Sequence, residues 1–418
     1  MTASIILKIF ITLKLAEYIV FIVLELLNML KVKANATVPK RYIDLIPQLT
    51  YLKSRDYSFS KQKFCLFATS FDLTLLILFI LLGGFEIFER LTMSVVNSEM
   101  FRAVIFCFAL GFAKEIIDLP FSLYGTFVLE EKFGFNKITF PLYVKDFFKS
   151  LILGILFGTP VICFIIWTIQ KANDFWWIYG FSGLSIFQLI VMWIYPTIIS
   201  PIFNKFTPLE KGELRDKIMK ISENINFKIS EIFLMDGSKR SGHSNAYFTG
   251  IGKNKRIVLF DTLVRSLSTD ELVAVLSHEM GHHKLNHIKK SIALSFMLSF
   301  ASFYIWSILI KYPPLYQAFK LQGNNLFPAL VIFPLIMSPI MFFISPLLNI
   351  FSRKNEYEAD SFAAKATNSP KDMQNALLKL NKENLSNLTP HPWYSFFYYS
   401  HPTLDERLDN LDSLATEK

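Results

Sequence analysis

Four of the seven histidines in the chain fall within twelve residues, LSHEMGHHKLNH at 276–287. Two of them, His278 and His282, are four residues apart, so on a helix their side chains share one face. One helical turn brings two imidazoles to a single zinc ion, which binds ring nitrogens at about 2.0–2.1 Å. Glu279 follows the first histidine directly, and a carboxylate there can take a proton from water that zinc has acidified. The stretch HEMGH therefore predicts a zinc site with hydrolytic chemistry.

A second pair, His283 and His287, has the same spacing. Lys284 follows His283, and its positive charge would disfavour a metal at this pair. We interpret His283 and His287 as surface residues, or as residues that support the ligands from behind. Because HExxH alone also occurs by chance on helix surfaces, the assignment depends on partners elsewhere in the chain.

Carboxylates that could complete the site lie downstream, in SRKNEYEADSFAAK at 352–365. Glu356 and Glu358 are two residues apart, so on a helix they point about 200° apart and only one can face the metal. Asp360 lies one turn after Glu356 on the same face, where it could hold a metal histidine in place. Glu358 has Lys354 one turn before it, which predicts a surface ion pair. Further on, SHPTLDERL at 400–408 contains His401 in a small polar setting.

Strand-like segments precede the histidines. IFLM at 232–235 and RIVLF at 256–260 read as strands, and GKNK at 252–255 reads as a turn. NAYFTG at 245–250 fits an adjacent strand whose exposed edge could receive an extended peptide. The alternative is a small structural hairpin with no role in binding.

The composition indicates what must position these residues. Of the 418 residues, 52% are hydrophobic, and only 18% are charged, against about 25% in an average soluble domain. Since a helix needs roughly 20 apolar residues to cross a bilayer, we predict seven membrane spans, the first a retained helix rather than a signal peptide. They lie at about 5–30, 66–89, 101–127, 149–170, 176–203, 291–311 and 327–351.

The net charge of +9 is distributed unevenly. Most of the 43 Lys and Arg residues fall in 31–65, 128–149 and 204–290 or after 351, and the alternate loops hold few. The positive-inside rule places the richer side, with HEMGH, in the cytoplasm, the N-terminus outside and the C-terminus inside. Such loops meet anionic lipid headgroups, and no aromatic-interleaved basic patch indicates nucleic acid.

Ionisable residues also occur inside the predicted spans, at Asp72, Glu86, Lys114, Glu115 and Asp118. Because charge is costly in hydrocarbon, such groups usually face a bundle interior or a water-filled cavity. They fit either a polar chamber or local pairs, for example Lys114 with Asp118 one turn later.

These features predict a mainly α fold: a seven-transmembrane-helix bundle with a gluzincin-like zinc-peptidase portion that contains a small β-hairpin or sheet. We divide the chain into 1–203 with five spans, 204–290 with the edge strand and the HExxH helix, 291–351 with two spans, and 352–418, which completes the zinc site.

Several stretches together resemble the Ste24 family of integral-membrane zinc metalloproteases, the type I CaaX prenyl proteases of peptidase family M48. They cover most of the chain and run in the family's order: EEKFGFNK (130–137), SPIFNKFTPLEKGEL (200–214), SKRSGHSNAYF (238–248), NKRIVLFDTL (254–263), HEMGH (278–282), SRKNEYEAD (352–360) and HPTLDERL (401–408).

The resemblance implies roles for individual residues and one Zn²⁺ ion. His278, His282 and Glu356 match the zinc ligands, Glu279 the catalytic base and Asp360 a carboxylate behind the ligands. His401 matches a histidine that stabilises the oxyanion. Asn245, Ala246 and Tyr247 match the strand along which substrate lies. Arg407 matches a basic residue near the site and is predicted to help bind substrate.

The implied function is a membrane-embedded zinc metalloendopeptidase acting on peptide or protein substrates, including removal of the last three residues of prenylated CaaX proteins. It would contact membrane lipid, with its site facing the cytoplasm, in the plasma membrane of a prokaryote or the endoplasmic reticulum of a eukaryote. Two alternatives remain: a multi-pass quality-control protease resembling HtpX, and a transporter or scaffold with structural zinc. Closed structural zinc sites usually have four ligands, often with cysteine, and Cys65, Cys107 and Cys163 lie far from HEMGH in the sequence.

Overall fold

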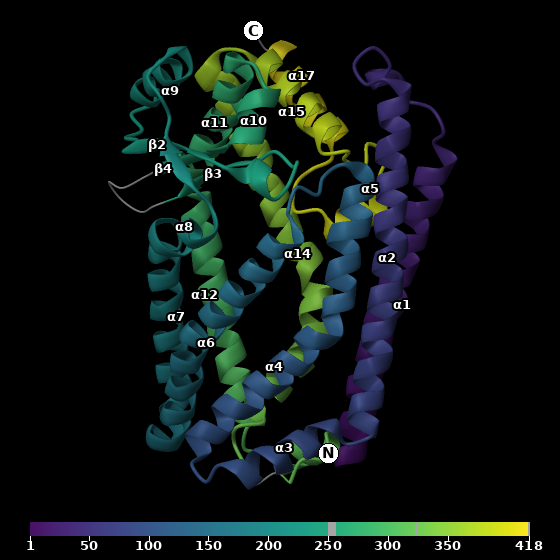
Figure 1. Cartoon of the computed structure of the whole chain (residues 1–418), viewed down its shortest axis with the longest axis vertical. Helices are drawn as coiled ribbons and strands as arrows, with labels where there is room; N and C mark the ends of the chain where they lie inside the picture. The colour runs from purple at the N-terminus through teal and green to yellow at the C-terminus, as the bar shows by residue number, and fades with distance from the viewer. Residues whose placement is uncertain (250–255, 323–324, 417–418) are drawn as a thin grey trace.

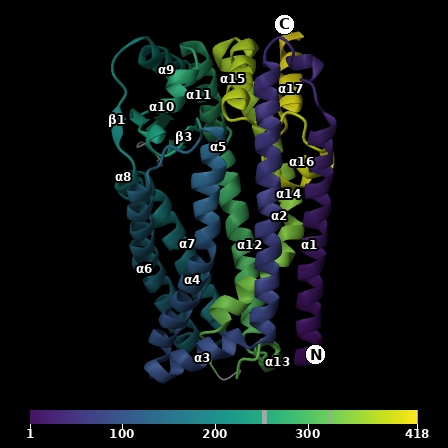
Figure 2. The ribbon, with the colours of Figure 1, turned by 45° about the vertical axis from the view of Figure 1, so that its right-hand side comes forward.

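The computed structural model describes residues 1–249, 256–322 and 325–416. Long helices run along the longest axis, and a small sheet with shorter helices lies at one end (Figure 1). The C-terminus lies at this end and the N-terminus at the opposite end, as the turned view in Figure 2 also shows. The predicted mainly α fold with a small sheet is confirmed.

Within the described residues, seven helices have 19 residues or more. They are α1 (Ala3–Ala34), α2 (Gln48–Leu81), α4 (Glu99–Tyr124), α6 (Phe140–Lys171), α7 (Trp176–Ile194), α12 (His287–Leu309) and α14 (Ala329–Thr367). Five segments are long and apolar enough to cross a membrane, namely α2, α6, the α7-containing segment Asn173–Phe203, α12 and α14. The predicted spans 5–30 and 101–127 fall on α1 and α4, which are continuous helices but are not among these five candidates in the described residues.

The charged residues of these helices form local pairs. Lys114 on α4 contacts Asp118 one turn later, as expected, and its Nζ also lies 3.2 Å from Asp72 on α2. Glu86 pairs with Arg90 one turn later on α3 (Gly84–Val95). Local pairing therefore accounts for four of the five ionisable residues singled out in the sequence.

The remaining helices are short. At the end that holds the N-terminus lie α3 and α13 (Pro313–Ala318) (Figure 2). Toward the other end lie α5 (Glu131–Phe133), α8 (Ser200–Phe203), α9 (Glu213–Asn224), α10 (Asp261–Ser266), α11 (Thr269–Lys284), α15 (Pro370–Glu383), α16 (Pro392–Tyr398) and α17 (Leu404–Thr416). Single turns occur at η1 (Lys40–Tyr42), η2 (Gly125–Glu130), η3 (Asn173–Phe175), η4 (Tyr195–Ile199) and η5 (Gly237–Lys239).

The sheet has four strands in the order β1-β2-β4-β3: β1 (Phe206–Pro208), β2 (Glu231–Met235), β4 (Arg256–Phe260) and β3 (Ala246–Thr249). β2 pairs parallel with β4, whereas β1 pairs antiparallel with β2 and β3 antiparallel with β4. The two predicted strands are β2 and β4, and NAYFTG supplies the edge strand β3. The sequence did not indicate β1, and the predicted turn GKNK lies outside the described residues.

The sheet packs against α11, the helix that carries HEMGH. Ile257 and Leu259 of β4 share a buried cluster with Leu272, Leu276 and Met280 of α11. The helix begins with a capping box, in which the Ser268 hydroxyl accepts from the Glu271 amide and the Glu271 carboxylate accepts from the Ser268 amide.

The long helix α14 joins the membrane portion to the metal site. It runs unbroken from Ala329 to Thr367, so the expected boundary between 351 and 352 falls inside it. The boundary between 290 and 291 likewise falls inside α12. Both boundaries were predicted where the sequence changes between apolar and charged residues. Such a change marks where a helix passes between membrane and water, but it does not interrupt the backbone hydrogen bonds of the helix. The carboxylates after residue 351 are thus held rigidly on a predicted span.

Candidate metal centre and active site

The two histidines of HEMGH lie side by side on α11. Their Nε2 atoms are 3.1 Å apart, and His278 is buried. The glycine between them allows α14 to approach: a Cβ on Gly281 would lie 3.1 Å from the Phe362 ring and 3.3 Å from the Ala359 Cα. The glycine in the second wildcard position of HExxH therefore suits the close packing of α11 on α14.

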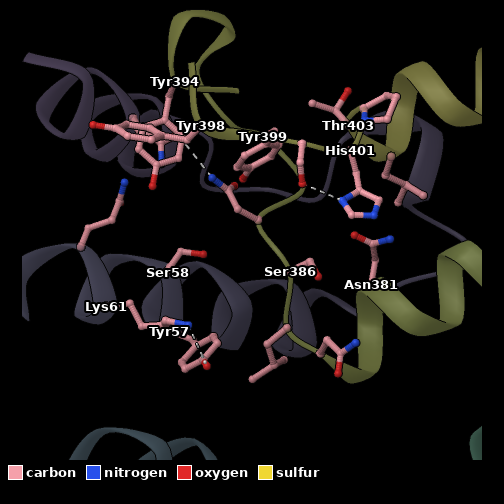
Figure 3. A pocket seen from close by; sticks show the side chains of 18 of the residues that line it. Tyr57, Ser58, Lys61, Asn381, Ser386, Tyr394, Tyr398, Tyr399, His401 and Thr403 are labelled. Atoms are coloured by element: carbon pink, nitrogen blue, oxygen red, sulfur yellow. Dashed lines mark hydrogen bonds between the residues drawn. The ribbon is translucent and has the colours of Figure 1, made fainter. Parts of the chain in front are cut away.

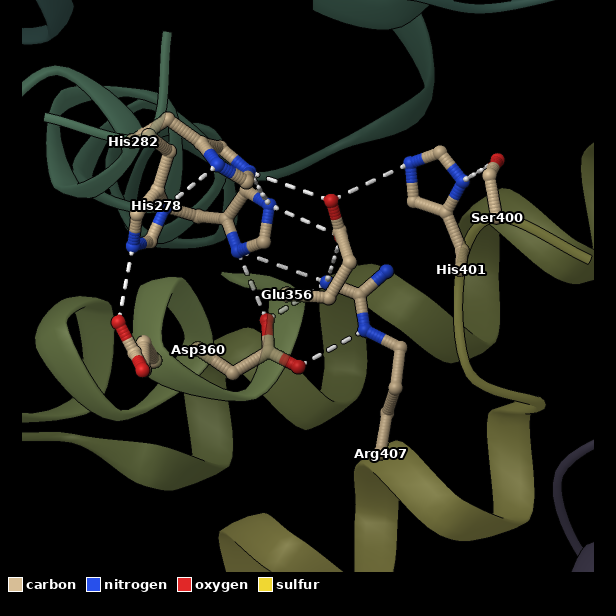
Figure 4. A network of polar contacts seen from close by, with 9 residues as sticks. His278, His282, Glu356, Asp360, Ser400, His401 and Arg407 are labelled. Atoms are coloured by element: carbon tan, nitrogen blue, oxygen red, sulfur yellow. Dashed lines mark hydrogen bonds and ion pairs between the residues drawn. The ribbon is translucent and has the colours of Figure 1, made fainter. Parts of the chain in front are cut away.

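Glu356 of α14 projects toward both histidines (Figure 4). Its Oε2 lies 3.4 Å from His278 Nε2 and its Oε1 lies 3.3 Å from His282 Nε2. One ligand atom from each of these three residues falls within 4.8 Å of the others. The sequence expectation that Glu356 rather than Glu358 faces the histidines agrees with this geometry.

The donor set fits a zinc ion. Two nitrogens bound tetrahedrally at 2.0–2.1 Å lie about 3.3 Å apart, close to the 3.1 Å between the histidine Nε2 atoms. The Oε2 atom of Glu356 is buried and makes no hydrogen bond, which is costly for a carboxylate unless a cation compensates it. Two imidazoles and one carboxylate form the three-ligand set of several catalytic zinc sites.

Asp360 lies behind His278. Its Oδ1 is 2.8 Å from His278 Nδ1, and the carboxylate also receives two hydrogen bonds from Arg407 of α17, at 2.6 and 2.8 Å (Figure 4). Burial lowers the pKa of His278, but the contacts with Asp360 and Glu356 outweigh it and raise that pKa to about 9. The surroundings of His278 therefore favour a positive charge, which a metal ion can supply in place of a proton.

Behind His282 lies His287, in the supporting position that was one of the two interpretations of this residue from the sequence. His287 Nδ1 lies 3.0 Å from His282 Nδ1, and His287 Nε2 lies 3.0 Å from Glu358 Oε2. The expectation that Glu358 forms a surface pair with Lys354 was wrong, and His287 is buried rather than at the surface. The reason is local: α11 ends at Lys284, and Asn286, at φ 58°, turns the chain so that His287 opens a new helix.

The surroundings of His283 and Glu279, the two remaining polar residues assigned in this stretch, differ from each other. His283 packs with its ring 5.6 Å from that of Phe227 and 5.9 Å from that of Phe248 on β3. It thus belongs to the contact between α11 and the sheet. Burial raises the pKa of Glu279, and the neighbouring His278 and His282 oppose this effect. A carboxylate with a raised pKa is a stronger proton acceptor.

His401 approaches from the loop before α17. Its Nε2 lies 3.5 Å from Glu356 Oε1, and its Nδ1 lies 3.1 Å from the Ser400 hydroxyl (Figure 4). The side chain is 63% exposed, so it borders the ligands while remaining open to an incoming molecule.

The strand expected to hold substrate lies next to the metal helix. Ala246 of β3 is buried in the same cluster as Leu272 and Leu276 of α11, whereas Asn245, just before the strand, is exposed. Tyr247 is partly buried, with its ring 6.3 Å from that of Phe260. Arg407, the basic residue matched near the site and predicted to help bind substrate, lies on α17 instead of this strand, and its guanidinium is engaged with Asp360.

Comparisons with known proteins bear on this site. Residues 28–205 match the family described as CAAX prenyl protease N-terminal, five membrane helices, and residues 208–415 match peptidase family M48. A CAAX prenyl protease 1 from Saccharomyces cerevisiae is 39% identical over 412 residues, covering 92% of this chain and 90% of that protein. The chain belongs to the Ste24 family of CAAX prenyl proteases.

Two further Ste24-family relatives span almost the whole chain. A CAAX prenyl protease 1 homolog from Oryza sativa is 38% identical over 390 residues, with 91% of this chain and 92% of that protein covered. The crystal structure of the S. mikatae Ste24p superposes with a TM-score of 0.93 at 34% identity, covering 99% of both chains. The chain is thus a multi-pass membrane protease of the metallopeptidase family M48 acting on peptide or protein substrates. The resemblance drawn from the motifs is confirmed, and the comparisons favour the Ste24 type over an HtpX-like protease or a scaffold.

Proposed function

We propose that this Ste24-family protease is a zinc-dependent endopeptidase in which His278, His282 and Glu356 hold one Zn²⁺ ion. The observation that supports the proposal is the convergence of their three donor atoms within 4.8 Å, with Glu279 next to the first ligand. A zinc ion held there would supply the Lewis acid that polarises the scissile carbonyl and acidifies a water molecule.

The other residues of the site transfer a proton, stabilise the oxyanion or orient a zinc ligand. Glu279 takes the proton of the attacking water and delivers it to the leaving amine. His401 stands beside Glu356 with Nε2 3.5 Å from its Oε1, where a ring N–H would donate to the developing oxyanion. Asp360, clamped by Arg407, accepts from His278 Nδ1–H and so directs its Nε2 lone pair at the ion.

For the substrate, we propose removal of the last three residues of prenylated CaaX proteins, since the relatives are named CAAX prenyl proteases. The substrate chain lies along Asn245, Ala246 and Tyr247, because β3 is the edge strand that packs against the metal helix α11, and an edge strand offers unpaired backbone groups to an extended peptide.

In the membrane, we propose seven crossings by α1, α2, α4, α6, the α7 segment, α12 and α14. Two observations support this count: the termini lie at opposite ends of the helices (Figure 1), as an odd number of crossings requires, and apolar side chains such as Ile19 of α1 and Ile116 of α4 are exposed, where lipid would cover them. The metal site then faces the cytoplasm, on the side with most of the Lys and Arg residues. The relatives compared above come from eukaryotes, which favours the endoplasmic reticulum.

The decisive experiment measures metal content and cleavage together. Purified protein should contain about one zinc ion per chain, and should release the last three residues of a farnesylated CaaX peptide faster than those of the unprenylated peptide. Glu356→Ala should lose both zinc and cleavage, because it removes one of three ligands. Protein that is fully loaded with zinc and cleaves neither peptide would contradict the proposal.

A further inference from the structure

A polar pocket of about 700 Å³ adjoins the metal site. It lies between α2 on one side and the segment from α15 to α17 on the other (Figure 3). His401 and Arg407 form part of its wall. Its volume falls in the range of sites that take small organic ligands. Since the metal site and the pocket share these two residues, a peptide cut at the metal would have one of its ends in the pocket.

The charge of the pocket favours an anion. Among the described residues that line it there is no Asp or Glu, and there are two cations, Arg407 and Lys61. Arg407 is neutralised by its two hydrogen bonds to Asp360. The nearby carboxylate Glu25 does not line the pocket, and its Oε1 accepts from the Tyr394 hydroxyl at 3.5 Å. Lys61 therefore contributes a positive charge with no described carboxylate in direct contact, and the Tyr57 hydroxyl beside it donates to Glu130 Oε1 at 2.7 Å.

Lys61 is held in place without an acidic partner. Its Nζ lies 5.0 Å from the centre of the Tyr57 ring and donates to the Tyr57 hydroxyl at 3.4 Å. In the described part of the chain no carboxylate oxygen lies within 4.0 Å of this nitrogen. Next to it, Gln62 is only 5% exposed and lines the same pocket, with its side-chain amide beside the Glu25 carboxylate. An ammonium without a contacting carboxylate suits a ligand that carries one.

The sheet indicates which end of a substrate reaches this pocket. A peptide that pairs antiparallel with β3, the more stable arrangement, runs from Thr249 toward Ala246 and then past residues 243–245. His243 lines the pocket, and Asn384 ties it to the opposite wall by accepting from the Ser244 amide at 3.1 Å. The C-terminal part of the substrate thus enters the pocket.

We propose that this pocket binds the residues that follow the scissile bond, and that Lys61 receives the C-terminal carboxylate of the substrate. The inference rests on the proposed function, because only an enzyme that cuts near a free C-terminus needs such a site. His401 and Lys61 lie at opposite sides of the pocket in Figure 3, so a carboxylate bound at Lys61 is separated from the cleavage site by the width of the pocket. Recognition of the terminal charge there would set the length of the released peptide.

The test measures binding of the released tripeptide, without cleavage. The tripeptide Val-Ile-Met and its C-terminal amide are titrated into zinc-loaded Glu279→Gln protein, alone and with Lys61→Met or Lys63→Met added. Lys63 is two residues along the same helix, with its Nζ over the Phe59 ring, and does not line the pocket. We expect the free acid to bind roughly 10–100-fold more tightly than the amide. Lys61→Met should abolish that difference and Lys63→Met should leave it.

Other results overturn the proposal. Equal affinity for the free-acid tripeptide and its amide would show that Lys61 does not bind the carboxylate. A preference for the free acid that persists in Lys61→Met would show the same. Displacement of the tripeptide by an equal concentration of inorganic phosphate would show a general anion site. Cleavage of the farnesylated CaaX peptide by the wild-type protein is measured separately, so a failure of the proposed function shows there, while a failure of this inference shows in the binding of the tripeptide.

Discussion

The Nε2 atom of buried His287 lies 3.0 Å from a carboxylate oxygen of Glu358, and its Nδ1 lies 3.0 Å from that of His282. Each histidine of HEMGH thus has a carboxylate behind it: Asp360 contacts His278 directly, and Glu358 reaches His282 through one intervening imidazole. Such groups orient a metal histidine and select its tautomer.

We expect Glu358→Ala to weaken zinc binding about 10–100-fold, because His287 would lose the group that holds its ring against His282. Competition with a chelator of known affinity measures the change. Lys354→Ala is the matched control, since it lies one turn before Glu358 and should leave zinc affinity unchanged. An unaltered zinc affinity in Glu358→Ala would show that the contacts from Glu358 through His287 to His282 do not contribute to zinc binding.

Replacing Glu279 by glutamine should abolish hydrolysis while preserving zinc. The substitution keeps the size of the side chain and leaves His278 and His282 in place, but removes the proton acceptor, whose contribution is about 10²–10⁴-fold in rate. Zinc content and kcat/KM on a farnesylated CaaX peptide are measured on the same sample. Activity within a few-fold of the wild type would exclude Glu279 as the base.

His401→Ala should lower kcat by roughly 10²–10³-fold with little loss of zinc. The side chain is 63% exposed and its nearest metal-site atom is Glu356 Oε1, 3.5 Å away, so its removal leaves the three ligands in position. Ser400→Ala, which removes only the hydrogen bond to His401 Nδ1, should have a much smaller effect. Parallel loss of zinc and activity in His401→Ala would indicate a structural role.

The first turn of α11 provides a prediction about stability and pH. Burial raises the pKa of Glu271, but the hydrogen bonds from Lys379 and the Ser268 amide outweigh it, so the pKa lies below the usual 4.5. A lowered pKa stabilises the fold above the unfolded-state value, and this stabilisation is lost as pH falls through the folded-state pKa.

Glu271→Gln retains a side chain that can complete the capping box but loses the charge that pairs with Lys379. We expect the variant to unfold at a lower temperature than the wild type at pH 7, and the gap to close as pH falls below 4.5. Thermal unfolding in detergent at several pH values measures it. A gap of constant size across that range would show that the charge of Glu271 does not stabilise the protein.

Much of the metal site follows from local periodicity, which the sequence displays directly. Spacing of four residues places His278 with His282 and Glu356 with Asp360, because an α-helix returns to the same face after one turn. Ser268 and Glu271 mark the start of α11 for a similarly local reason, since the capping box satisfies amides within the first turn. The edge strand at 245–249 was also indicated by its apolar pattern and by neighbouring turn residues.

What the sequence could not determine depends on residues far apart in the chain. His287 meets Glu358 across 71 positions and Arg407 meets Asp360 across 47, and both contacts exist only because α11, which His287 closely follows, and α17 pack beside α14. The pocket beside the metal likewise joins Lys61 of α2 to residues near the C-terminus. Local patterns decide which face of a helix is polar, but the packing of helices against one another decides which polar groups meet there, and that packing is the sum of many buried contacts.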